Sequence, residues 1–313
     1  APPTPSKMVK VVQPLQFATL EQDLFIHKRR NIMSNISIAT SAVLIDLNIS
    51  MWTARKLDRS VSKEIDVNKN TQVSAGNYNK HLLAGSEQLA KIGKLASEIR
   101  DWHGRQTLPW SDTGTRLLPM SNFFDYKTQL ADYELQFNER VNEFLVNYPR
   151  IVTMMAYNLG KLFDRAEYPD AEQIRNKYAM RYTIMPVPEA GDFRVDIADD
   201  IKSQMKSEYE DAYTSRVEHA VGDAWSRLHT TLQHMVERLG GNDKKIFRDS
   251  LIDNALDLTS LLSKLNVTND PKLENARKEL EKSLSGVSAE ELRLSPQLRT
   301  DVVSRVSAIM EKF

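Results

Sequence analysis

The feature that most constrains the fold is a run of apolar side chains between residues 201 and 239. They recur every three or four positions, which is the spacing of one helix face. The run predicts a single helix about 58 Å long at 1.5 Å per residue, ended by Gly240-Gly241. Helices of this length are rare in compact domains. We therefore expect it to pack against other long helices in an elongated bundle or an antiparallel coiled coil. The stripe consists of Ile201, Met205, Tyr209, Tyr213, Val217, Val221, Ala224, Leu228, Leu232, Met235 and Leu239.

Helical periodicity also covers most of the remaining chain. A long segment follows Asn122, and Pro149 within it is expected to kink or divide the helix. Asn269-Asp270-Pro271 and Ser295-Pro296 place Pro at the first helical position, which is a typical start of a helix. The other expected helices cover about 51–65, 79–102, 122–164, 243–265, 271–285 and 295–312.

Three short segments instead have the pattern of strands. Ile45, Leu47 and Ile49 alternate with polar residues, which indicates a half-buried strand at 43–50. Residues 115–118 fit a second strand, and 181–197 fit a β-hairpin whose Pro186 belongs at a sheet edge or a bulge. The predicted fold is therefore mainly α: an elongated helical bundle with long antiparallel helices and a small antiparallel β-sheet at one end.

The same patterns divide the chain into three parts. Residues 1–33 contain four prolines and a basic cluster, His27-Lys28-Arg29-Arg30, so we expect an extended N-terminal arm. Residues 34–241 are expected to form the helical body with its small sheet, and 242–313 a region of shorter helices.

Composition narrows the possible functions. Lys+Arg and Asp+Glu both number 42, and this balance argues against a broad nucleic-acid footprint. The 313 residues contain no cysteine, so disulfides, thiolate metal ligands and a cysteine nucleophile are excluded. The mean hydropathy is -0.46, and no apolar run approaches the roughly 18 residues of a spanning helix. These features predict a protein that does not enter a membrane.

The sequence contains no recognised catalytic, cofactor-binding or metal-binding motif. The phosphate-binding glycine loops and the serine-nucleophile elbow are missing. His229 and His234 lie about 140° apart around a helix, so they do not converge on a metal ion. We therefore expect a protein that is not an enzyme and holds no cofactor.

Asp196, Asp199 and Asp200 form the densest acidic group. They have the chemistry to bind Mg²⁺ or to do acid–base work. We favour the simpler interpretation that they occupy the start of the long helix, where carboxylates suit the helix dipole.

Two candidate binding regions remain. Trp102, His103, Arg105 and Trp110 suggest a pocket or a base-stacking platform, although two buried tryptophans at the end of a bundle explain the same pattern. A partner or nucleic-acid contact is the other candidate; it combines the arm with the first helix and consists of Lys28, Arg29, Arg30, Arg55, Lys56 and Arg59.

Several short stretches resemble a family of tailed-bacteriophage proteins, the DUF3150-type domain of unknown function. They are Trp52-Thr53-Ala54-Arg55-Lys56-Leu57, Tyr168-Pro169 and Pro186-Val187-Pro188, followed by Gly191-Asp192-Phe193-Arg194-Val195. The resemblance extends from about Met33 to Gly241 and contains no catalytic signature. It implies a phage origin, and members of such families are often encoded near a MoxR-like AAA+ ATPase and a von Willebrand A-type protein.

These observations lead to one functional expectation and one alternative. We expect a non-enzymatic phage protein that acts through protein–protein interaction, either as a virion or assembly component or as an adaptor to an AAA+ ATPase. Its partners are then other phage proteins, with a homo-oligomer possible, in the cytoplasm of the infected bacterial host or in the virion. The alternative is a nucleic-acid-binding accessory protein that uses the basic arm and the first helix.

Overall fold

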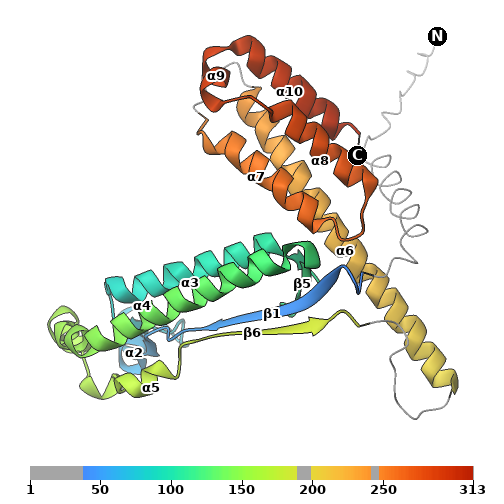
Figure 1. The fold of residues 1–313 in the computed structure, drawn as a ribbon. Coiled ribbons are helices and arrows are strands. Elements are labelled where there is room, and N and C mark those ends of the chain that lie inside the picture. Colours follow the sequence, from blue (N-terminus) through green and yellow to red (C-terminus); the bar gives the residue numbers. More distant parts are fainter. Residues whose placement is uncertain (1–37, 189–198, 241–246, 313) are drawn as a thin grey trace, which may run out of the picture.

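The computed structural model describes residues 38–188, 199–240 and 247–312 of the chain. It is mainly helical, with 66% helix and 11% strand, and it contains a small antiparallel sheet, as the sequence predicts. Figure 1 shows two bodies that meet at an angle. We call residues 38–188 the sheet body and residues 199–312 the C-terminal bundle. An elongated bundle of long antiparallel helices, which we expected, is not confirmed.

The four-stranded antiparallel sheet is built around a central long strand. Its order is β4-β5-β1-β6, and β1 pairs with β6 in a register that matches Val43 with Pro186 and Ser50 with Ala179. All three expected strand regions contribute to it, and Pro186 ends an edge strand, as predicted. The second strand of the expected hairpin, at 193–197, lies outside the described residues. The strands are β1 (Ala42–Ser50), β4 (Leu108–Pro109), β5 (Arg116–Pro119) and β6 (Ala179–Pro186).

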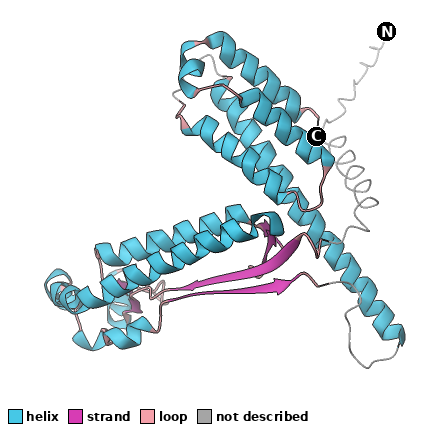
Figure 2. Cartoon of the chain, in the orientation of Figure 1, coloured by secondary structure: helices cyan, strands magenta, loops and turns pink. Residues whose placement is uncertain are grey.

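Two antiparallel helices cover the sheet (Figure 2): α3 (Glu87–Gln106) and α4 (Phe123–Asn158). Ser86 caps α3 by accepting a hydrogen bond from Leu89 N. Pro149 does not divide α4, because its ring is exposed and buried residues such as Tyr148 and Ile151 hold the helix on both sides of it. The five-residue α5 (Ala171–Arg175) packs on α4.

The predicted helix over 51–65 is wrong in its first half. Ala54 has a left-handed backbone with φ of 50°, which ends the extended segment and starts a short strand instead. That strand, β2 (Arg55–Leu57), pairs with β3 (Asn79–His81). Asp58 then caps α2 (Arg59–Asn68) by accepting hydrogen bonds from Ser60 N and Val61 N. The helix expected from residue 79 begins at Glu87 for a similar reason, because β3 and a turn at Gly85 (φ 76°) precede it.

The long predicted helix is confirmed as α6 (Asp199–Leu239), which ends directly before Gly240. Its apolar stripe is buried only from Val217 onward. The first turns project past the sheet in Figure 1, and Ile201 is half exposed there. α6 packs against α7 (Ser250–Leu265) and α10 (Pro296–Met310). α8 (Pro271–Leu284) packs on both of these helices, and α9 (Ala289–Leu294) packs on α10. Residues on both sides of the expected boundary at 241 therefore share one core.

The sheet does not cap the end of a single bundle but lies between two cores. On β1, Ile45 and Ile49 join the aromatic-rich core under α3 and α4. Leu44 and Ala42, on the opposite face, join the core that α6 and the C-terminal helices form. Successive side chains of a strand point to opposite faces, so one strand supplies both bodies.

Candidate functional site

The two bodies meet where α3 ends, and two arginines hold this end. Thr107 follows α3, and its carbonyl together with that of Gly104 would otherwise lack helical partners. Arg116 of β5 donates to Gly104 O and Thr107 O, each at 3.1 Å, and to Thr107 Oγ1 at 2.6 Å. Arg227 of α6 donates to Gly104 O (3.0 Å), Thr107 O (2.8 Å) and Arg105 O (2.6 Å).

Arg227 therefore links the bundle to the sheet body. Its guanidinium also pairs with Asp223 one helical turn earlier, at 2.7 Å. Cations near the last carbonyls of a helix are favoured by the helix dipole. A second link joins α7 to α4, because Lys264 Nζ lies 2.7 Å from Asp125 Oδ2. These polar links add to the apolar core that the sheet shares with the bundle.

His103 lies beneath this junction and is buried. Its Nδ1 is 2.7 Å from the hydroxyl of Tyr126 on α4, and Tyr126 stacks on Trp102. Burial, and next to it the charge of Arg116, lower the pKa of His103 from 6.5 to about 4. The imidazole is therefore neutral near pH 7 and acts as a packing and hydrogen-bonding group.

The predicted Trp–His–Arg region is not one pocket. Trp102 belongs to the core of the sheet body, whereas Trp110 belongs to the core of the bundle and packs edge-on against Tyr213 of α6. Both tryptophans are buried, as the alternative interpretation expected. Arg105 alone of the four is exposed, and it borders an open groove.

This groove, of about 1170 Å³, lies between the end of α3 and the helices α6 and α7. Four cationic side chains line it, Arg100, Arg105, Arg227 and Lys264, against two carboxylates, Asp101 and Asp257. Leu258 and Leu261 of α7 add half-buried apolar surface. Both bodies thus contribute walls to one concave surface.

The groove continues along α6 and α7 into a second hollow of about 610 Å³. The two share Thr230, Thr231 and Asn254. This extension adds Arg238, Arg248 and His234 and no carboxylate. Arg105 and Arg248 have no ion pair with any residue that the structure describes. We call the whole surface the basic groove.

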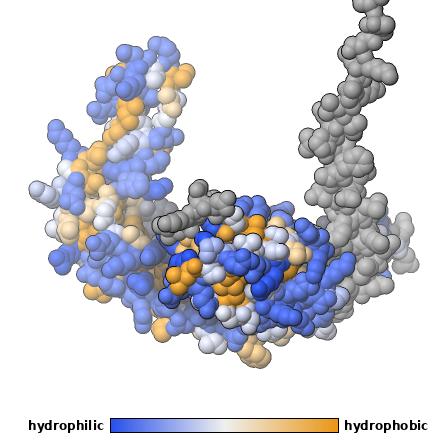
Figure 3. Space-filling view, turned by 90° about the horizontal axis from the view of Figure 1, so that it is seen from above, coloured by the Kyte–Doolittle hydropathy of each residue, from blue (hydrophilic) through white to orange (hydrophobic). Residues whose placement is uncertain are grey.

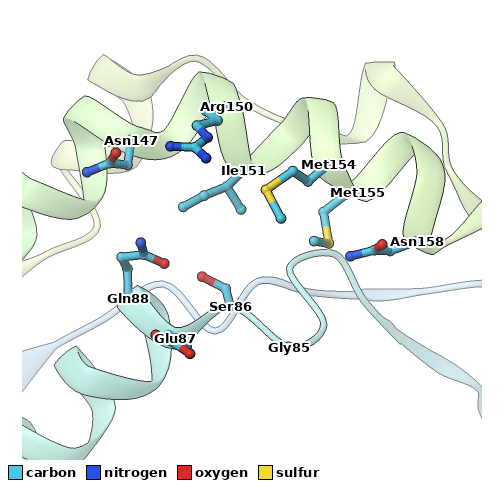
Figure 4. A pocket seen from close by; sticks show the side chains of 10 residues that line it. All are labelled: Gly85, Ser86, Glu87, Gln88, Asn147, Arg150, Ile151, Met154, Met155 and Asn158. Carbon is cyan, nitrogen blue, oxygen red and sulfur yellow. The ribbon is translucent and has the colours of Figure 1, made fainter.

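A smaller pocket of about 320 Å³ lies at the far end of the sheet body (Figure 4). The first turn of α3 forms one wall with Ser86 and Gln88, and the last turns of α4 form the other with Arg150 and Met154. The side chains facing each other across it are small, polar or flexible.

The other predicted contact residues lie away from the groove. Arg55 and Lys56 are exposed on β2, Arg59 is exposed in the first turn of α2, and Lys56 approaches Glu167 at 3.8 Å. Lys28, Arg29 and Arg30 lie outside the described residues, as does Asp196. Asp199 and Asp200 open α6, the position expected of helix-start residues.

Sequence reasoning missed most of the basic groove. Arg227, Thr231, His234 and Arg238 step by three or four along α6, with Thr230 beside Thr231, so they form a polar stripe that runs beside the apolar one. That spacing is visible in the sequence. The stripe becomes part of a groove only after folding, when α7 and the end of α3, which lies 120 or more residues away in the chain, border it.

Within residues 38–188, 199–240 and 247–312, no group of three or more His, Asp or Glu side chains is placed to hold a metal ion. No helix in those ranges is long and apolar enough to cross a membrane.

No protein-family model matches the chain, and neither the curated proteins nor the solved structures contain a significant match.

Proposed function

We propose that this protein is a non-enzymatic interaction protein that binds an acidic segment of a partner protein in the basic groove. The observation that carries the proposal is the surplus of positive side chains on a concave surface to which both bodies contribute. Complementary charge steers association and selects partners. Leu258 and Leu261 supply apolar contact beside the charges, as the centre of a protein interface requires.

The groove has the dimensions of a peptide site. From Arg227 to Arg238, α6 contributes about 16 Å of wall, and from Ser250 to Lys264, α7 contributes about 21 Å, at 1.5 Å per residue. An acidic helix of three or four turns matches this length. A helix laid in a groove is a common mode of peptide recognition.

The resemblance to tailed-phage proteins supplies a biological setting for the proposal. In that setting the partner is another phage protein, and the protein serves as a virion or assembly component or as an adaptor to a MoxR-like AAA+ ATPase. The basic groove is the surface through which such an adaptor would hold an acidic element of its partner.

The test compares charge-reversed variants in a quantitative pull-down from phage-infected host cells. The double variant Arg105→Glu with Arg248→Glu reverses two exposed cations of the groove that have no ion pair among the described residues. Arg305→Glu is the matched control, because Arg305 is also exposed but lies on α10. A partner that is lost only with the double variant supports the groove. A partner set that is unchanged by the double variant contradicts it.

A nucleic-acid-binding function is the second candidate, because Arg55, Lys56 and Arg59 are exposed together on β2 and the start of α2. Phosphate contacts predict a steep loss of affinity between low and physiological salt. Titration of a single-stranded oligonucleotide at two salt concentrations tests this. A flat response, or one that Arg55→Glu with Arg59→Glu leaves unchanged, excludes this surface.

A further inference from the structure

Charge and hydrogen-bonding capacity, not exposed apolar area, distinguish one part of the surface. Hydrophilic residues cover most of the face seen from above, and apolar residues show as small separate patches among them (Figure 3). Scattered apolar residues on a surface need no explanation. The extension of the basic groove, a hollow of about 610 Å³, is different, because its lining has three basic side chains and no carboxylate. We call this extension the α6–α7 hollow.

Arg238 of α6 is held in the hollow with its outer nitrogens available. Its Nε donates to Nε2 of His234, one helical turn earlier, at 3.2 Å. A ring nitrogen that accepts carries no proton, so His234 acts here as a neutral group that orients the arginine. Arg238 has no other hydrogen bond or ion pair with the residues that the structure describes. Its two Nη groups therefore keep the fork that binds two oxygens of a carboxylate or a phosphate.

Arg248 supplies a second guanidinium from just before the first turn of α7, and no nearby carboxylate neutralises it. The adjacent Asp249 is engaged elsewhere, because it accepts a hydrogen bond from Arg293 of α9. The two other acidic residues close by in the chain, Glu237 and Asp253, are exposed and do not line the hollow. The positive charge of the hollow is thus unbalanced by any lining residue that the structure describes.

Neutral donors complete the lining. Thr230 and Thr231 of α6 and Ser250 of α7 carry hydroxyls, and Asn254 of α7 carries a side-chain amide. Among the described residues, none of these four side chains has a hydrogen-bond partner. Together with two guanidiniums they offer more donors than the two oxygens of a carboxylate accept. A phosphate monoester presents three strong acceptor oxygens and about −1.5 to −2 charges at pH 7, so it suits this lining better.

The lining has no exposed phenyl, phenol or indole ring on which another ring could stack. Phe247 is only 4% exposed, and the guanidinium carbon of Arg293 lies over its ring, 5.4 Å from the centroid. Stacking on aromatic side chains supplies much of the affinity for the bases of single-stranded nucleic acids. Neither a nucleotide base nor the ring of a phosphotyrosine finds such a surface here.

The hollow is larger than a phosphate group and opens into the rest of the basic groove. The two parts of the groove share three lining residues of α6 and α7. From Ser250 to Leu258, α7 advances about 12 Å at 1.5 Å per residue. A ligand whose phosphate lies in the hollow therefore reaches the half-buried Leu258 and Leu261 within about three turns of a helix.

We infer that the α6–α7 hollow binds a phosphoserine or phosphothreonine side chain within the acidic segment of the partner protein. The inference rests on the proposed function, because the segment lies in the same groove, and it names the group that the segment carries. Arg238 and Arg248 bind the phosphate, His234 positions Arg238, and the hydroxyls and Asn254 donate to the remaining oxygens. Arginine clusters are a recurring means of recognising phosphorylated segments.

Capture from degenerate peptide libraries tests the inference without a known partner sequence. The immobilised full chain is offered Asp- and Glu-rich libraries of about 13 residues, or three to four helical turns. Their central position carries phosphoserine and phosphothreonine, Glu, or Ser. At fixed ionic strength we expect the wild-type protein to retain the phosphorylated library at least about 10-fold more than the Glu library.

The outcome separates this inference from the proposed function. Equal retention of the phosphorylated and Glu libraries would reject the phosphate site and would leave the acidic-segment proposal standing. Retention of neither library would contradict both. Retention of the phosphorylated library alone, or in about 10-fold excess, supports both.

Variants assign the effect to the hollow. Arg238→Gln should remove the preference for phosphate and lower retention of the Glu library by less than about 3-fold. Arg305→Gln, at an exposed position on α10, is the matched control and should change neither. His234→Ala should weaken the preference, and His234→Gln, whose amide oxygen also accepts from Arg238, should restore most of it. An Arg238→Gln protein that keeps the full preference overturns the inference.

Two further probes distinguish the source of the phosphate. A single-stranded oligonucleotide of thymidines, added at the concentration of the phosphorylated library, should not displace it. Displacement would identify a nucleic-acid backbone as the ligand and reject a phosphorylated protein. Calorimetric titration with inorganic phosphate covers small compounds. Binding that Arg238→Gln abolishes, without retention of any peptide library, would assign the hollow to a free phosphate compound and likewise reject the inference.

Discussion

The sheet body and the C-terminal bundle bury different kinds of side chain. The core of the sheet body is rich in rings, including Trp102, Tyr126, Phe137, Phe144 and Tyr178. The core of the bundle is dominated by Leu, Val and Ala. Buried polar groups follow the same division, because Lys80, His103 and Asn122 lie in the sheet body, whereas Thr259 and Ser283 are the buried polar residues described in the bundle.

This difference reflects how each body is assembled. Helices α7 to α10 follow one another through short connections and pack locally. The sheet body instead joins segments that are distant in the chain, as when β1 pairs with β6. Lys80 shows the consequence: it donates to Leu162 O at 2.7 Å and pairs with Glu167 at 2.6 Å and Asp58 at 3.5 Å, so three separate segments meet on one ammonium group. Specific polar and aromatic contacts hold the sheet body, and aliphatic packing holds the bundle.

The largest expected effect tests whether the two cores are separate. Phe144→Ala removes a fully buried ring from the sheet body and should lower its free energy of unfolding by about 3–5 kcal/mol. Hydrogen exchange in urea should show faster exchange in α3, α4 and β6 than in α8 and α10. Phe124→Ala on the same helix is the control, with less than about 0.5 kcal/mol expected because Phe124 is 79% exposed. Equal destabilisation of both bodies by Phe144→Ala would show one cooperative unit.

The next effect concerns the link between the bodies. Arg227→Leu removes three hydrogen bonds to carbonyls at the end of α3 and leaves Asp223 without its cation, so we expect a loss of about 2–3 kcal/mol. Small-angle X-ray scattering should also show a broader distribution of interatomic distances, because one of the links between the bodies is lost. Arg238→Leu, on the same helix and bonded only to His234 among the described side chains, should change neither quantity by much.

A pH-dependent effect should be confined to the sheet body. Because the pKa of His103 is lowered to about 4 in the folded protein, the unfolded chain takes up a proton near pH 6.5 that the folded chain does not. The free energy of unfolding is therefore unaffected by this residue above pH 6.5, and it declines as the pH falls from 6.5 toward 4. Between pH 7.5 and 5 the expected loss is about 1–2 kcal/mol. His103→Asn should flatten this part of the curve of stability against pH, whereas His229→Asn, at an exposed position, should preserve it.

The smallest effect should come from the second link. Lys264→Met breaks an ion pair with Asp125, whose side chain is 75% exposed, so we expect a loss below about 1 kcal/mol. Lys312→Met, which breaks the exposed pair with Glu279 inside the bundle, is the matched comparison. A loss above about 2 kcal/mol from Lys264→Met alone would place the main link at α7 instead of at Arg227.

Local sequence patterns predicted the elements that depend on local rules. The apolar stripe and Gly240 fixed α6, and alternation identified β1, because both signals come from neighbouring residues. The helix predicted from Met51 failed because its apolar spacing fits a helix, while the left-handed Ala54 and the capping Asp58 divide it. Pro149 was expected to interrupt α4 but lies on its exposed face, where the packing of adjacent residues maintains the helix.

The candidate site was less predictable than the fold. Arg105 was singled out and borders the groove, but Trp102 and Trp110 are buried in the two cores and His103 is buried as well. Arg227 contacts residues 120 to 123 positions away in the chain, and no spacing rule connects them. The exposure of Phe124, Val146 and Tyr157 on α4 was also missed, because these residues belong to a helix whose buried face is equally apolar. Only the structure separates the two faces.

Because β1 belongs to two cores, it cannot complete its packing until late in the synthesis of the chain. Ribosomes release this strand early, yet its partner β6 is complete only at Pro186 and the helix that covers its other face follows later still. At about 5–20 residues per second, the edge of β1 that pairs with β6 waits roughly 7–27 s for its partner, and the apolar face that α6 covers is exposed for longer. Nascent chains of this protein are therefore expected to need a chaperone at this stage more than the finished protein does.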